Sequence, residues 1–313
     1  MFRDGTTRRG RRDRCAIAAI AGLTTLLGAS NAQAFCRTTT CDPNVEDCSP
    51  PKGEPCTTKG LPLYWPVPCT SYNLQKDATA GISFGQFQQI ASVSFSAWTK
   101  VDCGGAGPSI QAIELEPISE AHACYNQAAP NVNAILFQTN KWPYSNSGST
   151  LALTTVTFNT ETGEIYDVDM EINSATATIT AGDTDIKYDL QSILTHEAGH
   201  YFGLAHRPKA DTEPVCPATM CATYKSGTTV LRTLQPDDIA GICAIYPPGR
   251  AVAGTCDPTP RHGFGTACVD PPADSSSGCC STAGSPARTP GRGMLALAGA
   301  MLGWVLVRAR RRR

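Results

Sequence analysis

Apolar residues recur every three or four positions in three parts of the chain, and a helix start signal precedes each part. Ser83 and Gln86 have the spacing of a capping box before the first part. Asp189 suits the N-cap of the second, which should end at Gly203, and Pro236 suits the first turn of the third. The predicted buried faces of the first and third helices contain Phe87, Ile90, Ala91, Ser94, Ala97 and Trp98, and Ile239, Ile242 and Tyr246. We therefore predict three helices.

Short apolar runs bounded by turn residues predict strands in the same part of the chain. These runs are 63–65, 109–116, 132–138, 151–158 and 165–172. Residues 160–163, Thr-Glu-Thr-Gly, have the composition of a hairpin turn between the last two runs. All of these elements lie in residues 61–248, which we predict to form the folded domain.

The N-terminal end combines arginines with an apolar run, as signal peptides do. A basic stretch at 8–14 precedes the apolar residues 15–29, and Ala32-Gln33-Ala34 fits a cleavage site. We therefore predict a signal peptide over residues 1–34 and export of the protein. A buried N-terminal helix is the alternative.

The C-terminal end, residues 291–313, repeats the combination in reverse. The apolar run 294–307 is followed by five arginines, which favours an apolar helix with a cytoplasmic end. This run is shorter than the about 20 residues of a full span. Together with Cys279 and Cys280 after a serine-rich stretch, it resembles MYXO-CTERM sorting tails, which implies attachment to the membrane and cleavage at one of these cysteines. A simple transmembrane anchor is the alternative, and the surface is the expected location in both cases.

Cysteines are frequent in the part of the chain that would be exported. Of 15 cysteines, 12 lie between Cys36 and Cys268, which predicts a disulfide framework. A cysteine-ligated zinc site is the alternative, although no paired CxxC spacing supports it. Residues 35–60 are a Cys- and Pro-rich N-terminal extension, and residues 249–290 are a linker rich in Gly, Pro, Ser and Cys.

The net charge of the whole chain is -1, but its middle part is acidic because many of the arginines lie near the two ends. Residues 35–280 contain 13 basic and 25 acidic residues. An acidic body repels phosphate backbones, so we expect no nucleic-acid partner, whereas basic peptides or calcium are compatible with this charge. We expect a monomer that acts on protein or peptide substrates.

Residues 196–206 match the pattern H-E-x-x-H-x-x-G-x-x-H at every fixed position. The fixed positions are His196, Glu197, His200, Gly203 and His206. Two histidines four residues apart on a helix share a face and can bind one zinc ion. Gly203 permits the left-handed turn that ends the helix and returns His206 as the third ligand. A buried helix whose histidines only form hydrogen bonds would leave Gly203 and His206 unexplained.

Three protein ligands leave the fourth position of a tetrahedral zinc ion open for water, as in catalytic sites. Glu197 follows the first ligand by one residue and can reach that water as the general base. Zinc would lower the pKa of the water to roughly 7 and polarise the scissile carbonyl. The motif therefore predicts hydrolysis of peptide bonds without a covalent intermediate.

Three further segments resemble the matrixins, the matrix-metalloproteinase-like branch of the metzincins. Residues 217–224, Pro-Ala-Thr-Met-Cys-Ala-Thr-Tyr, are similar to the family's methionine turn, and residues 234–246 to its closing helix. Residues 158–173 look like its strand pair beside the cleft. The resemblance covers about 61–248 and implies an α+β metzincin fold, in which a mixed twisted sheet, the active-site helix and a C-terminal helix flank a zinc cleft. It also implies that Met220 lies beneath the zinc without binding it and that Tyr224 is structural.

Several departures from the family pattern matter for function. Met220 lies farther beyond His206 than is usual, with Cys216 in the added stretch, so we expect a reshaped specificity pocket closed by a Cys216–Cys221 disulfide. We expect one zinc ion, since the other histidines are too few for a second site. The residues that could bind calcium as in relatives, or lie on a solvated loop, are Asp167, Asp169, Asp183 and Asp185.

Two other functions remain open: a zinc hydrolase of non-peptide substrates, and a surface-anchored binding protein with a protease-like scaffold. The intact Glu197 argues against the scaffold, and the long resemblance argues against a non-peptide substrate.

Overall fold

The structure is a computed structural model, and the part that it describes begins after the predicted signal peptide. The described residues are 35–77, 81–119, 123–145, 147–207, 216, 218–252, 254–267, 300–301 and 304–310. They all belong to the second of two compact units, Gln33–Arg313. The signal peptide prediction and the proposed tail cysteines, Cys279 and Cys280, lie outside the described residues.

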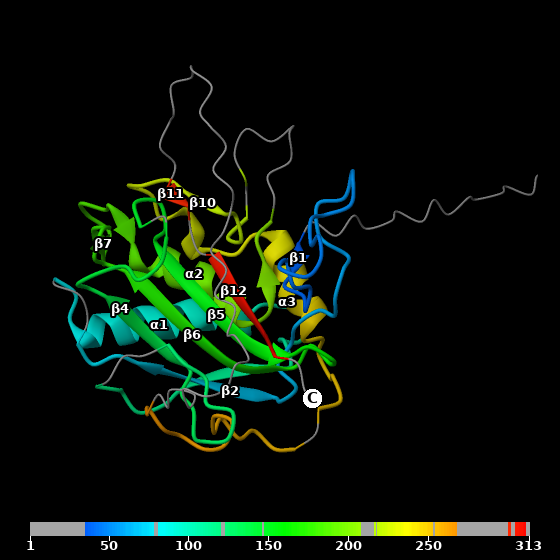
Figure 1. The fold of residues 1–313 in the computed structure, drawn as a ribbon. Helices are drawn as coiled ribbons and strands as arrows, with labels where there is room; N and C mark the ends of the chain where they lie inside the picture. Colours follow the sequence, from blue (N-terminus) through cyan, green and yellow to red (C-terminus); the bar gives the residue numbers. More distant parts are fainter. Residues whose placement is uncertain are drawn as a thin grey trace, which may run out of the picture. The chain divides into compact units, whose positions relative to one another are not determined.

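A six-stranded mixed sheet forms the framework, with the strand order β12-β5-β6-β4-β2-β3 (Figure 1). The strands are β2 (Cys69–Leu74), β3 (Gln111–Glu114), β4 (Ala134–Gln138), β5 (Ala152–Asn159), β6 (Ile165–Asn173) and β12 (Trp304–Arg310). Strands β3, β2, β4 and β6 are parallel, β5 is antiparallel to β6, and β12 runs parallel to β5. The α+β metzincin fold is confirmed.

The helices are α1 (Phe84–Thr99), α2 (Leu190–Tyr201), α3 (Pro236–Ile245) and the short 3-10 helix η1 (Val230–Arg232). The predicted capping box of Ser83 and Gln86 is present. Asp189 caps α2 by accepting a hydrogen bond from the Ser192 amide at 2.8 Å. Pro236 lies in the first turn of α3, as predicted. In α3, Ile242 and Ile245 are buried, whereas Ile239 is only half-buried.

Helices α1 and α2 pack together on one face of the sheet (Figure 1). Alternate residues of β6, namely Val168, Met170 and Ile172, join them in the main hydrophobic core. The indole of Trp98 in α1 donates to the Thr195 carbonyl of α2 at 2.7 Å. The core therefore fixes the active-site helix against the sheet.

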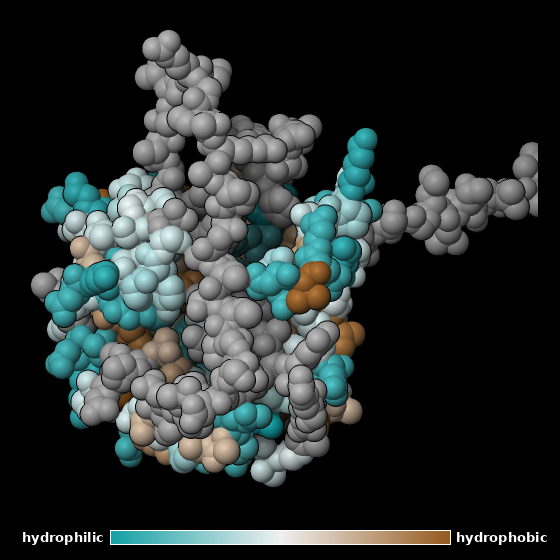
Figure 2. All heavy atoms as spheres, viewed as in Figure 1, coloured by the Kyte–Doolittle hydropathy of each residue, from teal (hydrophilic) through white to brown (hydrophobic). Residues whose placement is uncertain are grey.

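Three two-stranded ladders surround this framework. They pair β1 (Cys36–Arg37) with β9 (Leu204–Ala205), β7 (Ile179–Thr180) with β8 (Tyr188–Asp189), and β10 (Thr223–Tyr224) with β11 (Ala300–Met301). Figure 2 shows one face of the molecule. On this face the described residues are mainly hydrophilic, and the hydrophobic residues form small separate patches. The exposed large hydrophobic residues are Val45, Leu61, Val93, Val230 and Phe264.

The predicted strands are confirmed within a few residues, with one exception. Residues 63–65 form only an isolated bridge, from Tyr64 to Glu164. Strand β2 was not predicted, because all six of its residues are buried and the segment shows no alternation of polar and apolar positions. Parallel strands covered on both faces often lack that alternation.

The predicted apolar helix over 294–307 is wrong for residues 300–301, which form β11, and for residues 304–307, which belong to β12. The described residues include no helix that is long and apolar enough to cross a membrane. Two of the residues in β12, Val305 and Val307, are β-branched, and the free edge of β5 offers backbone partners along its whole length.

The disulfide framework is confirmed for the described residues. Five bonds are Cys36–Cys56, Cys41–Cys48, Cys69–Cys256, Cys103–Cys243 and Cys216–Cys221. Cys124 is also disulfide-bonded. All the described cysteines are thus disulfide-bonded, and none of them is available as a thiolate to bind zinc. A cysteine-ligated zinc site therefore has no support among the described residues.

Candidate metal centre and active site

Helix α2 presents the first two predicted ligands. His196 and His200 lie one turn apart on the helix, and both are fully buried. Asp189 anchors the start of this helix, and the Trp98 contact described above holds its middle. The two imidazoles therefore have fixed positions before any metal binds.

The chain turns at Gly203 as the motif predicts. Its φ is 96°, a left-handed conformation that side chains rarely allow. A Cβ atom at this position would lie 2.6 Å from the Leu63 carbonyl oxygen. The turn leads directly into β9, which ends one residue before His206. Glycine is thus required both for the turn and for the close contact that returns the third ligand.

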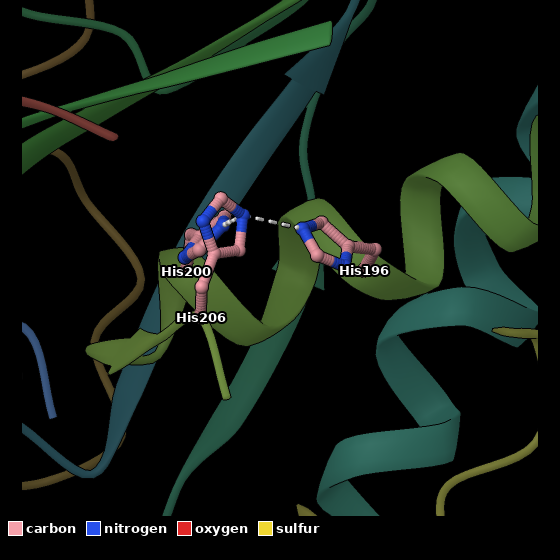
Figure 3. Close-up of side chains that lie close together, drawn as sticks. All are labelled: His196, His200 and His206. Carbon is pink, nitrogen blue, oxygen red and sulfur yellow. Dashed lines mark hydrogen bonds between the residues drawn. The ribbon is translucent and has the colours of Figure 1, made fainter. Parts of the chain in front are cut away.

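The three imidazoles converge on one point (Figure 3). The Nε2 atom of His206 lies 3.1 Å from Nε2 of His196 and 3.1 Å from Nε2 of His200. In the two imidazoles on α2, the other ring nitrogen, Nδ1, contacts a backbone carbonyl. For His196 this is the Thr219 oxygen at 2.7 Å, and for His200 the Leu204 oxygen at 2.9 Å.

These contacts fit a zinc ion. A ring whose Nδ1 donates its proton to a carbonyl has a bare Nε2 lone pair, so His196 and His200 both direct lone pairs at the same point. A cation at that point is the partner that such lone pairs require. Two nitrogens at roughly 2.0–2.1 Å from a tetrahedral zinc ion are about 3.3 Å apart, close to the observed spacing.

The environment keeps the histidines neutral, as metal ligands must be. Burial lowers the pKa of His196 to about 4 and that of His206 to about 3, the latter with a contribution from His196. Burial also places the pKa of His200 well below its usual value. Protons therefore compete weakly with a metal for these nitrogens at neutral pH.

Glu197 lies on the same helix and is also fully buried. Its Oε2 accepts a hydrogen bond from the Thr154 hydroxyl of β5 at 2.5 Å, whereas its Oε1 has no hydrogen-bond partner among the described residues. Burial raises the pKa of Glu197 to about 8, and the Thr154 bond opposes that rise. One oxygen is thus fixed and the other is available for a proton.

Met220 packs directly against the helix that carries the ligands. A Cβ atom at Gly199 would lie 2.2 Å from the Met220 sulfur and 2.8 Å from the Trp98 ring. The sequence alone did not predict a role for Gly199, although it occupies a variable position of the motif. Its missing side chain makes room for Met220 against α2.

The family model for the matrixins matches residues 120–247, which include all of these site residues. The match and the histidine triad together support a matrixin-like metzincin catalytic domain in this segment. The family implies zinc, and the match supports a zinc metalloprotease in general.

The matrixin-like domain holds its methionine turn through α3. The buried carboxylate of Asp238 accepts hydrogen bonds from the amides of Thr219 at 2.8 Å and Met220 at 3.1 Å. The Thr219 carbonyl in turn contacts His196. Asp238 therefore fixes the backbone of the residue whose carbonyl contacts His196. Such outer contacts commonly tune metal affinity.

Tyr224 connects the loop after the methionine turn to the start of α2. Its hydroxyl accepts a hydrogen bond from the Asp189 amide at 3.2 Å and donates to the Thr228 carbonyl. Arg232 reinforces this link with two bonds to the Asp189 carboxylate, at 2.8 and 2.7 Å. Tyr224 therefore links these two segments through its hydroxyl.

The four aspartates considered for calcium do not form one group. Asp167 and Asp169 lie buried on strand β6 and not on a loop, while Asp183 pairs with Arg232 at 2.6 Å. Asp185 has a left-handed φ of 52° in the loop before α2. Among the described residues, the histidine triad is the one group found that could hold a metal ion.

Proposed function

We propose that this protein is a zinc-dependent endopeptidase in which His196, His200 and His206 bind one catalytic zinc ion and Glu197 is the general base. The observation that carries the proposal is the convergence of three neutral imidazoles beside a buried carboxylate with one free oxygen. The matrixin family match supports the same class of enzyme.

The chain's own residues supply the proton transfers. A bound zinc ion would polarise the scissile carbonyl and acidify the attacking water. Glu197 takes a proton from that water and passes it to the nitrogen of the leaving amine. Thr154 holds the other carboxylate oxygen in place during both transfers.

Strand β5 supports a peptide as the substrate. Its outer edge pairs with the extended segment β12 along residues 153–159, beside Thr154 and the Glu197 carboxylate. An edge that pairs with an extended segment of this chain can pair with an extended substrate peptide in the same way. A substrate that used this edge would have to replace β12. Removal of the tail by processing at Cys279 or Cys280 would free it.

The two alternative functions have less support. A binding protein with a protease-like scaffold would not need a buried base with one free oxygen. A zinc hydrolase of non-peptide substrates would not need a strand edge of this kind beside the base.

A peptide library tests the proposal. The purified protein would be incubated with a mixed library, with chelator, without chelator, and with zinc returned after chelation. We expect cuts at internal peptide bonds that disappear with chelator and return with zinc. A zinc-loaded protein that makes no cuts would contradict the endopeptidase and favour the scaffold.

We extend the proposal to the location of the enzyme, which we place outside the cytoplasm and linked to the cell surface by its tail. The signal-type N-terminus and the disulfide-bonded cysteines support export. Peptide mapping of the surface form would test processing. An intact arginine-ended tail on most molecules would contradict cleavage at Cys279 or Cys280 and favour a plain anchor.

A further inference from the structure

The N-terminal extension, residues 35–60, is joined to the backbone that leads into the third histidine. Strand β1 pairs antiparallel with β9, which ends one residue before His206. The Thr38 amide continues this ladder by donating to the Gly203 carbonyl at 3.0 Å. The extension therefore holds the backbone from the Gly203 turn to the residue before His206.

One backbone carbonyl links the extension to the second histidine as well. The Leu204 oxygen contacts His200 Nδ1 at 2.9 Å and also accepts a hydrogen bond from the Thr38 hydroxyl at 2.9 Å. The contact with His200 determines which ring nitrogen carries the proton and so directs Nε2 to the metal position. Thr38 is buried, so its hydroxyl belongs to the fixed surroundings of this carbonyl.

Arg37 and Leu63 connect the extension to the backbone that packs against the Gly203 turn. The Arg37 guanidinium donates to the Leu63 carbonyl, and the Leu63 amide donates to the Thr38 carbonyl at 2.8 Å. The Leu63 carbonyl is the group that lies against Gly203. The extension thus fixes both the strand that ends at His206 and the backbone that supports its turn.

We propose that the extension is part of the metal site and that Thr38 is a positioning residue for His200 and His206. The Cys36–Cys56 disulfide ties β1 covalently to the far end of the extension, whereas Cys41–Cys48 closes a separate loop within it. This inference rests on the proposed zinc site. It adds a role for a segment that precedes the matched part of the matrixin-like domain.

The test is the zinc dissociation constant of the full exported chain, measured by competition with a chromophoric chelator. Thr38→Val keeps the shape of the side chain but removes its hydroxyl, and we expect it to weaken zinc binding by about tenfold or more. Thr38→Ser keeps the hydroxyl and should restore near wild-type affinity. Thr40→Val is the matched control, because the Thr40 hydroxyl accepts a bond from the Leu61 amide and none from β9.

A second pair of variants decides the question if Thr38→Val does not fold. We expect Cys36→Ser with Cys56→Ser to weaken zinc binding, and Cys41→Ser with Cys48→Ser to leave it unchanged. The zinc affinity of the variant that folds, Thr38→Val or the Cys36/Cys56 variant, is compared with that of the wild type. Equal affinities would overturn the role of the extension but would leave the proposed enzyme function intact. A wild-type protein that binds no zinc would instead overturn the proposed function.

Discussion

The matrixin-like domain buries two clusters of polar side chains, one on each face of its sheet, and they are organised differently. On the helix side, the three histidines converge on one point, and Glu197, the residue after His196, has one carboxylate oxygen without a partner among the described residues. On the other side, alternate residues of β6 form an acidic row of Asp167, Asp169 and Glu171. In this row Glu171 accepts bonds from Gln138, at 2.6 Å, and from Tyr144, while Asp169 accepts one from the Ala134 amide at 2.9 Å.

The difference shows that burial alone does not identify a site. Both clusters contain fully buried carboxylates, and burial raises the pKa of Glu197 and of Asp169 alike. In the histidine cluster, backbone carbonyls contact Nδ1 of His196 and of His200, and this leaves Nε2 of each ring for a metal. In the acidic row, the carboxylates are spaced along a strand and bind different neighbours. We therefore expect substitutions in the first cluster to change catalysis and those in the second to change stability.

Two buried glutamates give the sharpest form of the comparison. Glu197→Gln removes the base without changing its shape, so we expect kcat to fall by about 10²–10⁴ with one zinc ion retained. Glu171→Gln is the matched control, since Glu171 also accepts a hydroxyl bond, from Tyr144. It should leave kcat per folded molecule near the wild-type value. Peptide cleavage and zinc content would be measured for both variants. Near wild-type cleavage by Glu197→Gln would show that the mechanism is wrong.

Loss of the hydroxyl that donates to Glu197, from Thr154, should lower kcat, whereas loss of the hydroxyl that donates to Glu171, from Tyr144, should not. Thr154→Val leaves Glu197 without its fixed contact, and we expect a loss of roughly tenfold in kcat, because a hydrogen bond to a charged group contributes about 1.5–3 kcal/mol. KM and zinc content should change little. Thr154→Ser should recover most of the rate, and Tyr144→Phe should not alter it. A purely structural Thr154 would give the same kcat in the Val and Ser variants.

The acidic row should affect the dependence of stability on pH. Burial, followed by the neighbouring Asp167, raises the pKa of Asp169 well above its usual value. For a carboxyl whose pKa is raised by folding, the stability that it contributes is present below the unfolded pKa of about 3.9 and is lost as pH rises through the folded pKa. Asp169→Asn should therefore gain stability relative to the wild type as pH rises. Urea unfolding at pH 4 and pH 8 would measure the difference, and a difference that does not grow with pH would refute it.

The sequence predicted the parts of the site that local spacing determines. A helix places His196 and His200 on one face, and only glycine suits the turn at position 203, so the motif predicted that the three histidines come together. The supporting contacts could not be predicted in this way. Thr38, which follows β1, and Thr154 in β5 reach the site from segments far away in the sequence, and such contacts depend on how the strands pair in the folded domain.

Similar reasoning explains the errors in the fold. Strand β2 has no polar and apolar alternation because it is covered on both faces. Residues 304–307 are all apolar, and such a segment suits a helix in a membrane and a strand at an open sheet edge equally well. The edge of β5 that decides between them is formed by residues about 150 positions earlier in the chain.

Zinc K-edge X-ray absorption on the purified wild-type protein tests the central claim most directly. We predict one zinc ion per chain with three nitrogen ligands and one oxygen ligand, all at roughly 2.0–2.1 Å. The His206→Ala variant should lose this signature. Sulfur ligands at about 2.3 Å, or an unchanged spectrum in the His206→Ala variant, would contradict the account.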